Sequence, residues 1–374
     1  MSLYLVLFFV CAICAFFGFN AKTEKLAYAV SFLLTLGLLV FRYGQGTDWL
    51  AYNYIFESAP RHLNFSSVFY SSSIHSEFGW KLINNIWKAL GFDFISLSMI
   101  SALLEMTLFN KFINRYSTNR ALSIFISLPV VYFTYFFSAL RQGVVIAVFL
   151  GYMVTLLEKN AYCRYSLVAL LLCFIHSISI LFFIVPFINK VNIKHLSLLI
   201  TISVVLGFIF LFGLRPLISL LGFSYESSSI SWLAIMYRAL MFFIILFLYS
   251  GIREMNPVFD FLFKIYCFGF CIYLILCSNQ IIASRLASPF LAVEIALVPS
   301  LIRQQIEFDK QAIMLLLCII LLCALMFCKN ISASISQGEY APQVSVINYP
   351  YISVFNKEDI FRVSNNRFLI FLSI

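Results

Sequence analysis

The sequence predicts an all-α polytopic membrane protein with about 11–12 transmembrane helices. Hydrophobic residues make up 62% of the chain and charged residues only 11%, and the mean hydropathy is +0.97. Soluble proteins carry roughly 25% charged residues. Apolar runs of about 16–25 residues recur from one end of the chain to the other, as spanning helices require. We therefore expect residues 1–374 to form a single integral membrane domain.

Each expected span is an apolar run of helix length bounded by polar residues. The candidate spans are 2–19, 26–41, 93–110, 121–138, 143–158, 165–188, 196–213, 231–250, 261–278, 286–302 and 311–328. The first run has neither a basic start nor a small-residue cleavage site, so we expect an uncleaved helix rather than a signal peptide.

The composition also argues against several classes of site. Almost all of the ten cysteines, including the C-x-x-C pair Cys11 and Cys14, lie inside apolar runs, which favours small hydrophobic side chains over redox or metal chemistry. The four histidines show no zinc-ligand spacing. There is no P-loop, no dinucleotide-binding glycine pattern and no basic stripe with interleaved aromatics. We therefore expect no metal, no cofactor and no nucleic-acid partner.

The positive charges predict the orientation of the chain and a break in one span. Lys22 and Lys25 place the first loop in the cytoplasm, which makes residues 42–92 periplasmic. If 165–188 crossed the membrane once, the later basic loops would lie outside. A hairpin or broken helix that turns at residues 176–179 returns those loops to the cytoplasm. We therefore predict a re-entrant break near His176, which lines a cavity open to the outer side.

Two segments outside the spans are expected on the outer side. Residues 329–374 form a periplasmic tail, and the loop 42–92 contains an interfacial amphipathic helix at 77–91. Two sets of residues define the faces of that helix: Trp80, Ile83, Trp87 and Leu90 on the apolar face, and Lys81, Asn84, Asn85 and Lys88 on the polar face.

This topology places several ionisable residues at the outer face. Charges at membrane depth are energetically costly, so each of these residues is a candidate functional residue. They are Arg42, Asp48, Glu77, Arg141, His176, Arg215 and Arg285. Arg238, Glu105 and Glu294 lie within spans, where an internal ion pair, such as Glu294 with an arginine, is the alternative to a function. Several arginines at a membrane rim favour a pyrophosphate ligand, because guanidinium groups bind phosphate oxygens bidentately.

Six segments resemble, in order, the sequence elements of the EpsG family of polysaccharide polymerases. They are FRYGQGTDWLAYNYIF, SEFGWKLIN, ALRQGVVIA, FIHSISILFF, ASRLASPFLAVE and INYPYISVF, and they extend from about residue 42 to 355. The chain departs from the pattern at Trp49, where tyrosine is more usual, and this leaves an aromatic residue in place.

The resemblance implies a membrane glycosyltransferase of the GT-C type, of which Wzy-type O-antigen polymerases are examples. Such an enzyme transfers a growing glycan from undecaprenyl pyrophosphate onto the next undecaprenyl-pyrophosphate-linked repeat unit, at the periplasmic face of the inner membrane. The implied partners are these two lipid-linked oligosaccharides, membrane lipid and a chain-length regulator protein. The reaction then needs no metal, provided that arginines neutralise the leaving pyrophosphate.

Within this framework the residues take expected roles, several of which stay open. Arg141 and Arg285 bind the donor pyrophosphate, and Arg42 or Arg238 binds the donor or the acceptor pyrophosphate. His176 is a hydrogen-bond donor to the leaving group or a base, whereas Asp48 or Glu77 is the base or a ligand of sugar hydroxyls. The expected sugar contacts are Trp49, Tyr52 and Gln142. A structural alternative is that Asp48 pairs with Arg42 and that Gly44 and Gly46 only turn the chain.

Two other classes of protein would also need arginines near lipid-linked sugars. A flippase or transporter would place them along a central cavity and usually carries internal repeats, and we find no convincing repeat. An O-antigen ligase would use similar chemistry with a lipid-A core as acceptor. Apart from the family resemblance, the sequence does not separate the ligase from the polymerase.

The predicted break can be tested by labelling a cysteine at its turn. In a cysteine-free background, Ser177→Cys is expected to react with a membrane-impermeant maleimide added from the outer side, because the turn faces a cavity on that side. Labelling only from the cytoplasmic side would rule out the re-entrant topology.

Overall fold

The computed structural model describes residues 2–63, 77–188, 190, 195–210, 230–250, 257–306, 310–337 and 340–360, and all of its named elements are helices. The first half of the chain forms α1 (Leu3–Phe17), α2 (Glu24–Val40), α3 (Trp49–Glu57), α5 (Phe78–Ala89), α6 (Phe94–Tyr116), α7 (Arg120–Ser127), η1 (Leu128–Phe136), α8 (Leu140–Val148), η2 (Phe149–Met153), α9 (Val154–Glu158), α10 (Tyr162–Cys173), η3 (Ser177–Ile184) and α11 (Val185–Ile188). The second half forms α12 (Leu196–Ile209), α14 (Trp232–Ser250), α15 (Pro257–Leu276), α16 (Gln280–Leu291), α17 (Glu294–Ile306), α18 (Lys310–Gln337) and η6 (Lys357–Asp359).

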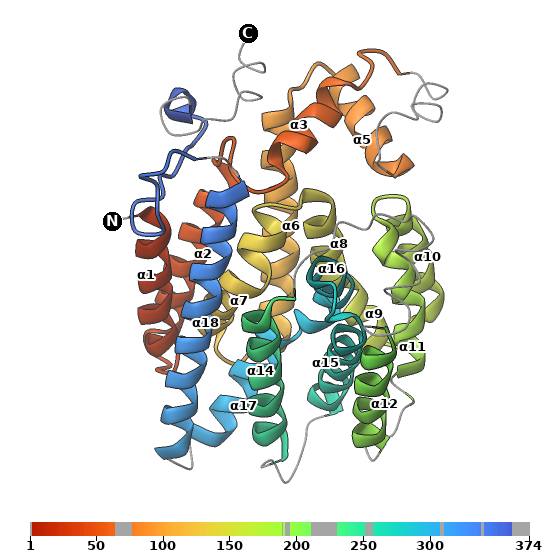
Figure 1. Cartoon of the computed structure of the whole chain (residues 1–374), viewed down its shortest axis with the longest axis vertical. Coiled ribbons are helices and arrows are strands. Elements are labelled where there is room, and N and C mark those ends of the chain that lie inside the picture. Colours follow the sequence, from red (N-terminus) through yellow and green to blue (C-terminus); the bar gives the residue numbers. More distant parts are fainter. Residues whose placement is uncertain are drawn as a thin grey trace.

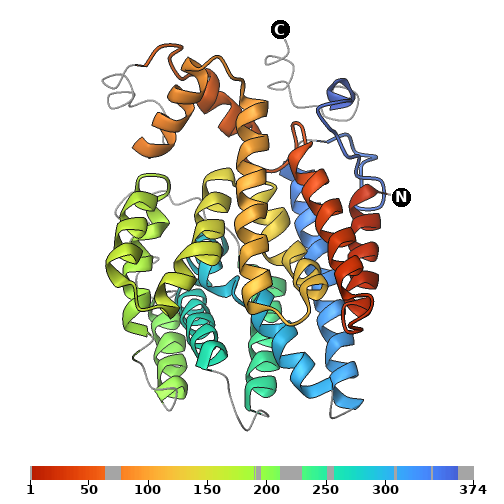
Figure 2. The same cartoon turned by 180° about the vertical axis from the view of Figure 1, so that it is seen from behind.

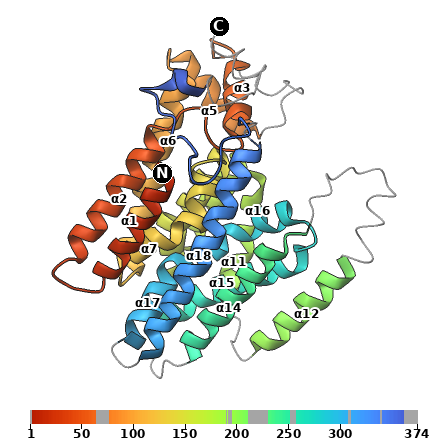
Figure 3. The same cartoon turned by 60° about the vertical axis from the view of Figure 1, so that its left-hand side comes forward.

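The helices form a bundle with one end covered by shorter elements. Most helices run side by side along the long axis, and α3 and α5 lie at one end, near the C-terminal segment (Figures 1 and 2). Figure 3 shows α1 and α2 at one edge of the molecule and α12 at the other. The outward side chains are large and apolar, for example Phe9 and Ile13 of α1 and Phe243 of α14, as contact with lipid requires.

The all-α membrane architecture is therefore confirmed. In the described residues, four helices are long and apolar enough to cross a membrane, or five if the bent pair α16 and α17 counts as one span. This is fewer than the expected 11–12, because breaks divide several apolar runs into helices of 10–17 residues. A 12-residue helix spans only about 18 Å, which is less than the hydrocarbon core of about 30 Å.

The broken segment expected near His176 is present as a helical hairpin. Helix α10 ends at Cys173, and the 3₁₀ helix η3 starts at Ser177. The Tyr165 hydroxyl donates a hydrogen bond of 2.8 Å to the Phe182 carbonyl, which places the two arms antiparallel. The turn lies at the end of the molecule where α5 is found (Figure 2), and the Gly79 N–H donates to the Phe174 carbonyl at 2.7 Å.

A second irregularity divides the long apolar run from Leu128 to Leu157. Its first part, η1, is a π-helix, and the chain then leaves helical geometry at Ala139 before α8 begins. Arg141 and Gln142 therefore lie in the first turn of α8. Short π-helical segments are often found at functional sites.

The loop after α2 is held by the C-terminal segment. The Tyr43 N–H donates to the Ile352 carbonyl, and the Val354 N–H donates to the Phe41 carbonyl, both at 2.9 Å. The buried Gln45 side chain donates to the Pro350 carbonyl at 2.7 Å and accepts from the Ile352 N–H at 2.9 Å. The segments that resemble the first and last sequence elements of the EpsG family are therefore joined by hydrogen bonds.

Gly46 allows this loop to approach the bundle closely. Its φ angle is 105°, and a Cβ atom at this position would lie 2.5 Å from the Phe137 carbonyl oxygen. A larger residue would have both a strained backbone and a steric overlap. This glycine brings the loop that carries Asp48 against the end of η1.

Helix α5 buries residues from both its apolar face and its polar face, unlike the expected amphipathic helix. Trp80 is buried as predicted, but Asn84 and Asn85 are also buried, whereas Leu90 is exposed. The Asn85 amide donates to the carbonyls of Pro60 and His62, at 2.8 and 3.0 Å. The polar face is therefore covered by protein, because the segment after α3 folds over it.

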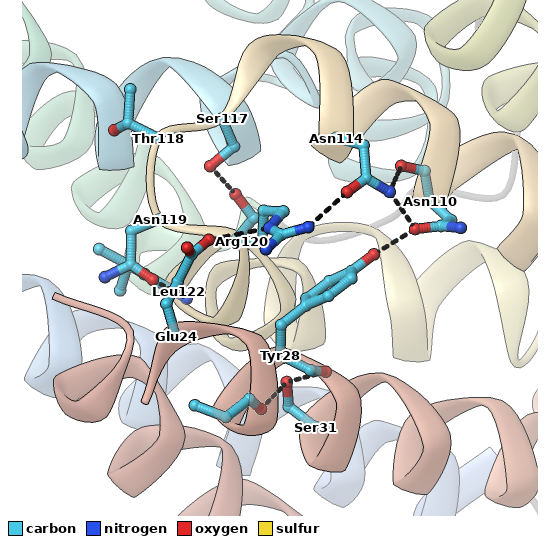
Figure 4. Close-up of polar contacts among 12 residues, drawn as sticks. Glu24, Tyr28, Ser31, Asn110, Asn114, Ser117, Thr118, Asn119, Arg120 and Leu122 are labelled. Carbon is cyan, nitrogen blue, oxygen red and sulfur yellow. Dashed lines mark hydrogen bonds and ion pairs between the residues drawn. The ribbon is translucent and has the colours of Figure 1, made fainter. Parts of the chain in front are cut away.

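A polar network stabilises the other end of α6, at the loop that joins it to α7 (Figure 4). Arg120 forms an ion pair with Glu24 at 2.8 Å and donates to the Asn114 side chain at 2.8 Å. Asn119 caps α7 and donates to the Ala15 carbonyl at 3.1 Å. These bonds join α1 and α2 to the α6–α7 loop.

The close contact at Gly79 makes a testable prediction about the hairpin. A Cβ atom on Gly79 would lie 2.6 Å from the Phe174 carbonyl oxygen, so Gly79→Ala should destabilise the protein by about 1–3 kcal/mol. Gly37→Ala is the matched control, because nothing lies within 4 Å of its Cβ position. Thermal unfolding of the purified protein measures both variants, and an equal effect of the two would contradict the tight contact.

Candidate functional site

Three residues that are distant in the sequence meet around the carboxylate of Glu77. Glu77 precedes α5 and forms an ion pair with Arg141 of α8, which is 64 residues away. Its other oxygen accepts the Ser177 N–H at 3.0 Å and lies 3.6 Å from Nδ1 of His176. The three side chains are between 17% and 22% exposed. The carboxylate thus joins the outer loop, the start of α8 and the turn of the hairpin.

The electrostatics of this cluster set the protonation states. Burial raises the pKa of the Glu77 carboxyl, but the Ser177 N–H and the Arg141 guanidinium outweigh it, so this pKa lies below its ordinary value. Burial lowers the pKa of His176, and Arg141 and Arg285 lower it further against the opposing effect of Glu77. At neutral pH the cluster therefore contains a carboxylate and a neutral imidazole.

The orientation of the imidazole follows from the backbone. Nδ1 of His176 accepts the Ile178 N–H at 3.4 Å, which caps the start of η3. In a neutral imidazole with Nδ1 as acceptor, the proton is on Nε2. His176 can therefore donate one hydrogen bond to a ligand from Nε2.

A cavity of about 230 Å³ lies beside this cluster. It is lined by Thr47, Asp48, Phe133, Thr134, Tyr135, Ser138, Ala139, Gln142, Ile281, Ser284, Arg285, Asn330, Ala333 and Ser334. Asp48 and Arg285 face each other there, with 4.0 Å between the carboxylate and the guanidinium. The Gln142 amide donates to the Arg285 carbonyl at 2.8 Å and to the Ser288 hydroxyl at 3.0 Å, which ties α8 to α16.

The two parts form one continuous region at the end of the bundle. Arg141 of the cluster and Gln142 of the cavity are neighbours in the first turn of α8. The structure therefore brings together Asp48, Glu77, Arg141, Gln142, His176 and Arg285, all of which the sequence nominated.

Trp49 and Tyr52, the expected sugar contacts, are largely buried. Trp49 is 3% exposed and packs edge-to-face against Phe94, with 5.3 Å between ring centroids. Tyr52 is 4% exposed, packs against Trp80, and lies 5.5 Å below the Arg141 guanidinium. Both rings thus contribute to the core under the site, and Tyr52 also supports Arg141 by a cation–π contact.

Arg238 is not part of the cavity lining and has an internal partner. Its guanidinium forms an ion pair of 2.9 Å with Glu294, which is fully buried. The internal pair that the sequence left open for Glu294 is therefore the observed arrangement. Arg238 is not among the residues that line the cavity beside Asp48, so its expected contact with pyrophosphate stays a prediction.

Arg42 is also separate from the cavity. It is 2% exposed, donates to the Leu39 carbonyl at 3.0 Å and lies over the Phe137 ring at 5.2 Å. The C-terminal segment covers it through an antiparallel bridge between Arg42 and Ser353. The cation beside Asp48 is Arg285 and not Arg42, which the alternative had suggested. Glu105, likewise fully buried, contributes nothing to the cavity lining.

Sequence analysis missed the neutral polar residues of the cavity. They are Thr47, Thr134, Ser138, Ser284, Asn330 and Ser334. Asn330 and Ser334 lie four residues apart near the end of α18, and this spacing places both on one side of the helix as a polar stripe. The other nominated residue, Arg215, lies outside the described residues, as does the tail beyond residue 360. Within the described part of the chain, His, Cys, Asp and Glu form no group of three or more suited to a metal ion.

The fold and site together define a polytopic all-α membrane protein with a charged site at one end of its bundle. Residues 25–350 match the sequence model of the EpsG family, and the chain therefore belongs to the EpsG family. No curated protein and no solved structure matches the chain. The family is associated with Wzy-type polymerases, which indicates a polysaccharide polymerase-like function.

The ion pair at the centre of the site can be measured by a double-mutant cycle. Glu77→Gln, Arg141→Gln and the double variant should give a coupling energy of about 1–3 kcal/mol, because both side chains are mostly buried. The Lys88–Glu57 pair is the control, since its carboxylate is 52% exposed and such pairs contribute below about 1 kcal/mol. Chemical unfolding in detergent provides the measurement. A coupling no larger than that of the control pair would refute the central role of Glu77.

Proposed function

We propose that this protein is an O-antigen or exopolysaccharide polymerase that joins two undecaprenyl-pyrophosphate-linked glycans at the periplasmic face of the inner membrane. The observation that carries the proposal is the meeting of Arg141 and Arg285, from two different helices, with Asp48, Glu77 and His176 at one end of an apolar bundle. Membership of the EpsG family supports it.

The charges suit a pyrophosphate at the membrane surface. Guanidinium groups stay charged at any relevant pH and bind phosphate oxygens in a bidentate manner. The prenyl tail of the same ligand would lie against the apolar outer surface of the helices. In this proposal Arg141 and Arg285 bind the donor pyrophosphate, and the Nε2–H of His176 donates to the leaving group.

The two carboxylates differ in how free they are to react. Both oxygens of Glu77 already interact with the protein, one with Arg141 and one with the Ser177 N–H. Asp48 lines the cavity, where its carboxylate accepts from the Thr47 hydroxyl at 3.1 Å and lies 4.0 Å from the Arg285 guanidinium. Because a base must reach the proton it removes, we assign the base to Asp48 and a positioning role to Glu77.

The reaction then proceeds as follows. A hydroxyl of the terminal acceptor sugar attacks the anomeric carbon of the donor, and the carbon–oxygen bond to pyrophosphate breaks. Asp48 accepts the hydroxyl proton, and the electron pair of the broken bond stays on the pyrophosphate oxygen. Arg141 and Arg285 stabilise the negative charge that develops there. Gln142 holds the two helices together beside the sugar.

A gel of surface polysaccharide tests this function. Deletion of the gene should collapse the ladder of long chains to a single repeat unit on the core. Loss of all repeats with accumulation of long lipid-linked polymer would indicate a ligase instead. Loss of all repeats with single lipid-linked units trapped in the cytoplasmic leaflet would indicate a flippase.

Complementation with variants tests the site itself. Arg285→Lys and Asp48→Asn should each reduce long-chain polymer at least about 100-fold, because a lysine cannot bind two phosphate oxygens in the bidentate manner of a guanidinium and an asparagine cannot accept the hydroxyl proton. Arg164→Lys is the control, since Arg164 is exposed and distant from the cavity lining. Membrane fractions must contain equal amounts of each protein. Normal ladders from both site variants would refute the assigned roles.

A further inference from the structure

We propose that Asn330 of α18 binds a hydroxyl or acetamido N–H of the terminal acceptor sugar and so selects the repeat unit. This inference rests on the proposed polymerase function and concerns the cavity beside Asp48. Asn330 lines that cavity together with Ala333 and Ser334.

The orientation of the Asn330 amide is determined by its protein partners. Its nitrogen donates to the Pro129 carbonyl at 2.9 Å and to the Thr134 hydroxyl at 3.2 Å. A carbonyl oxygen can only accept, so the nitrogen of the amide must face Pro129. The two N–H groups of the amide are thereby used, and its oxygen is left to accept a hydrogen bond from a ligand.

The π-helix is part of this arrangement. Pro129 and Thr134 both belong to η1, which supplies Phe133, Thr134 and Tyr135 to the cavity wall. The side chain of Asn330 thus bridges α18 to the wider backbone of η1. A side chain held at two points loses little further conformational entropy when a ligand binds.

The lining favours a neutral polar ligand over an anion at this wall. Apart from Asp48 and Arg285, every residue of the cavity lining is uncharged. An amide oxygen attracts donor hydrogens and does not favour phosphate oxygens. Sugar hydroxyls and acetamido groups supply such donors, whereas pyrophosphate at neutral pH supplies mainly acceptors.

The position of Asp48 indicates whether the acceptor sugar or the donor sugar occupies this part of the cavity. Asp48 lines the same cavity and is the proposed base, so the hydroxyl that loses its proton must lie there. That hydroxyl belongs to the acceptor. The neutral wall of the cavity is therefore assigned to the terminal acceptor sugar, which Asn330 contacts, and the Arg285 side is assigned to the donor pyrophosphate.

The test measures the two substrates separately. Purified protein in nanodiscs receives lipid-linked polymer as donor and labelled undecaprenyl-pyrophosphate-linked single repeat units as acceptor. Asn330→Ala should raise the acceptor KM about tenfold, the loss of one hydrogen bond to a ligand. The donor KM should change less than about twofold, because Asn330 contacts the acceptor only. A purely structural role would instead lower kcat and affect both substrates alike.

A second variant leaves every hydrogen bond of Asn330 in place. Ala333→Leu adds bulk to the same wall and should raise the acceptor KM by at least about tenfold without changing the donor KM. Ser332→Leu is the matched control, because Ser332 is exposed on the same helix and does not line the cavity.

The outcomes distinguish failure of the proposed polymerase function from failure of the proposed acceptor subsite. Absence of any polymer from the wild-type protein would overturn the proposed function. Polymer formation by the wild type, with an unchanged acceptor KM in Ala333→Leu and in a folded Asn330→Ala, would overturn the acceptor subsite alone.

Discussion

The geometry of the candidate site depends on one buried carboxylate. Glu77 binds segments that are 64 and 100 residues away in the chain, through Arg141 and the Ser177 N–H. A partly buried carboxylate and guanidinium stabilise each other only when both are present, since removal of either leaves an uncompensated charge. The outer loop, the first turn of α8 and the hairpin turn are therefore positioned together. His176 and Arg141 take their places as a consequence.

The irregular backbone of the bundle lies where polar groups are needed. The hairpin turn, the π-helix η1 and the loop after α2 all interrupt apolar runs, and each contributes residues to the cluster or the cavity. Regular helices satisfy their own backbone, so breaks at membrane depth survive only where protein or a water-filled cavity satisfies the freed groups. Here the partners are Gly79, Asn330 and Gln45. In the described part of the chain, these breaks bring polar residues together at the candidate site.

Several residues nominated at interruptions and ends of apolar runs meet in the structure. Arg141 interrupts an apolar run, His176 lies at the predicted break and Arg285 lies between two expected spans, and the structure brings them close together. Local sequence did not show the partners of Arg42 and Arg238, because those partners come from residues far away in the chain. Ser353 is 311 residues from Arg42 and Glu294 is 56 residues from Arg238, and no local pattern connects either pair. Asn84 and Asn85 of α5 were misplaced for a similar reason, since the segment that covers them is not part of the helix.

The sequence by itself determined the membrane class, the helical architecture, the break near His176 and the family, because these follow from local hydropathy, charge placement and short motifs. Only the tertiary structure decided which charges pair, which carboxylate lines the cavity and which neutral residues line it as well. Pairing depends on distances across the bundle, and those distances are set by packing. The helical spacing of Asn330 and Ser334 is visible in the sequence. The contact of Asn330 with η1 is visible only in the structure.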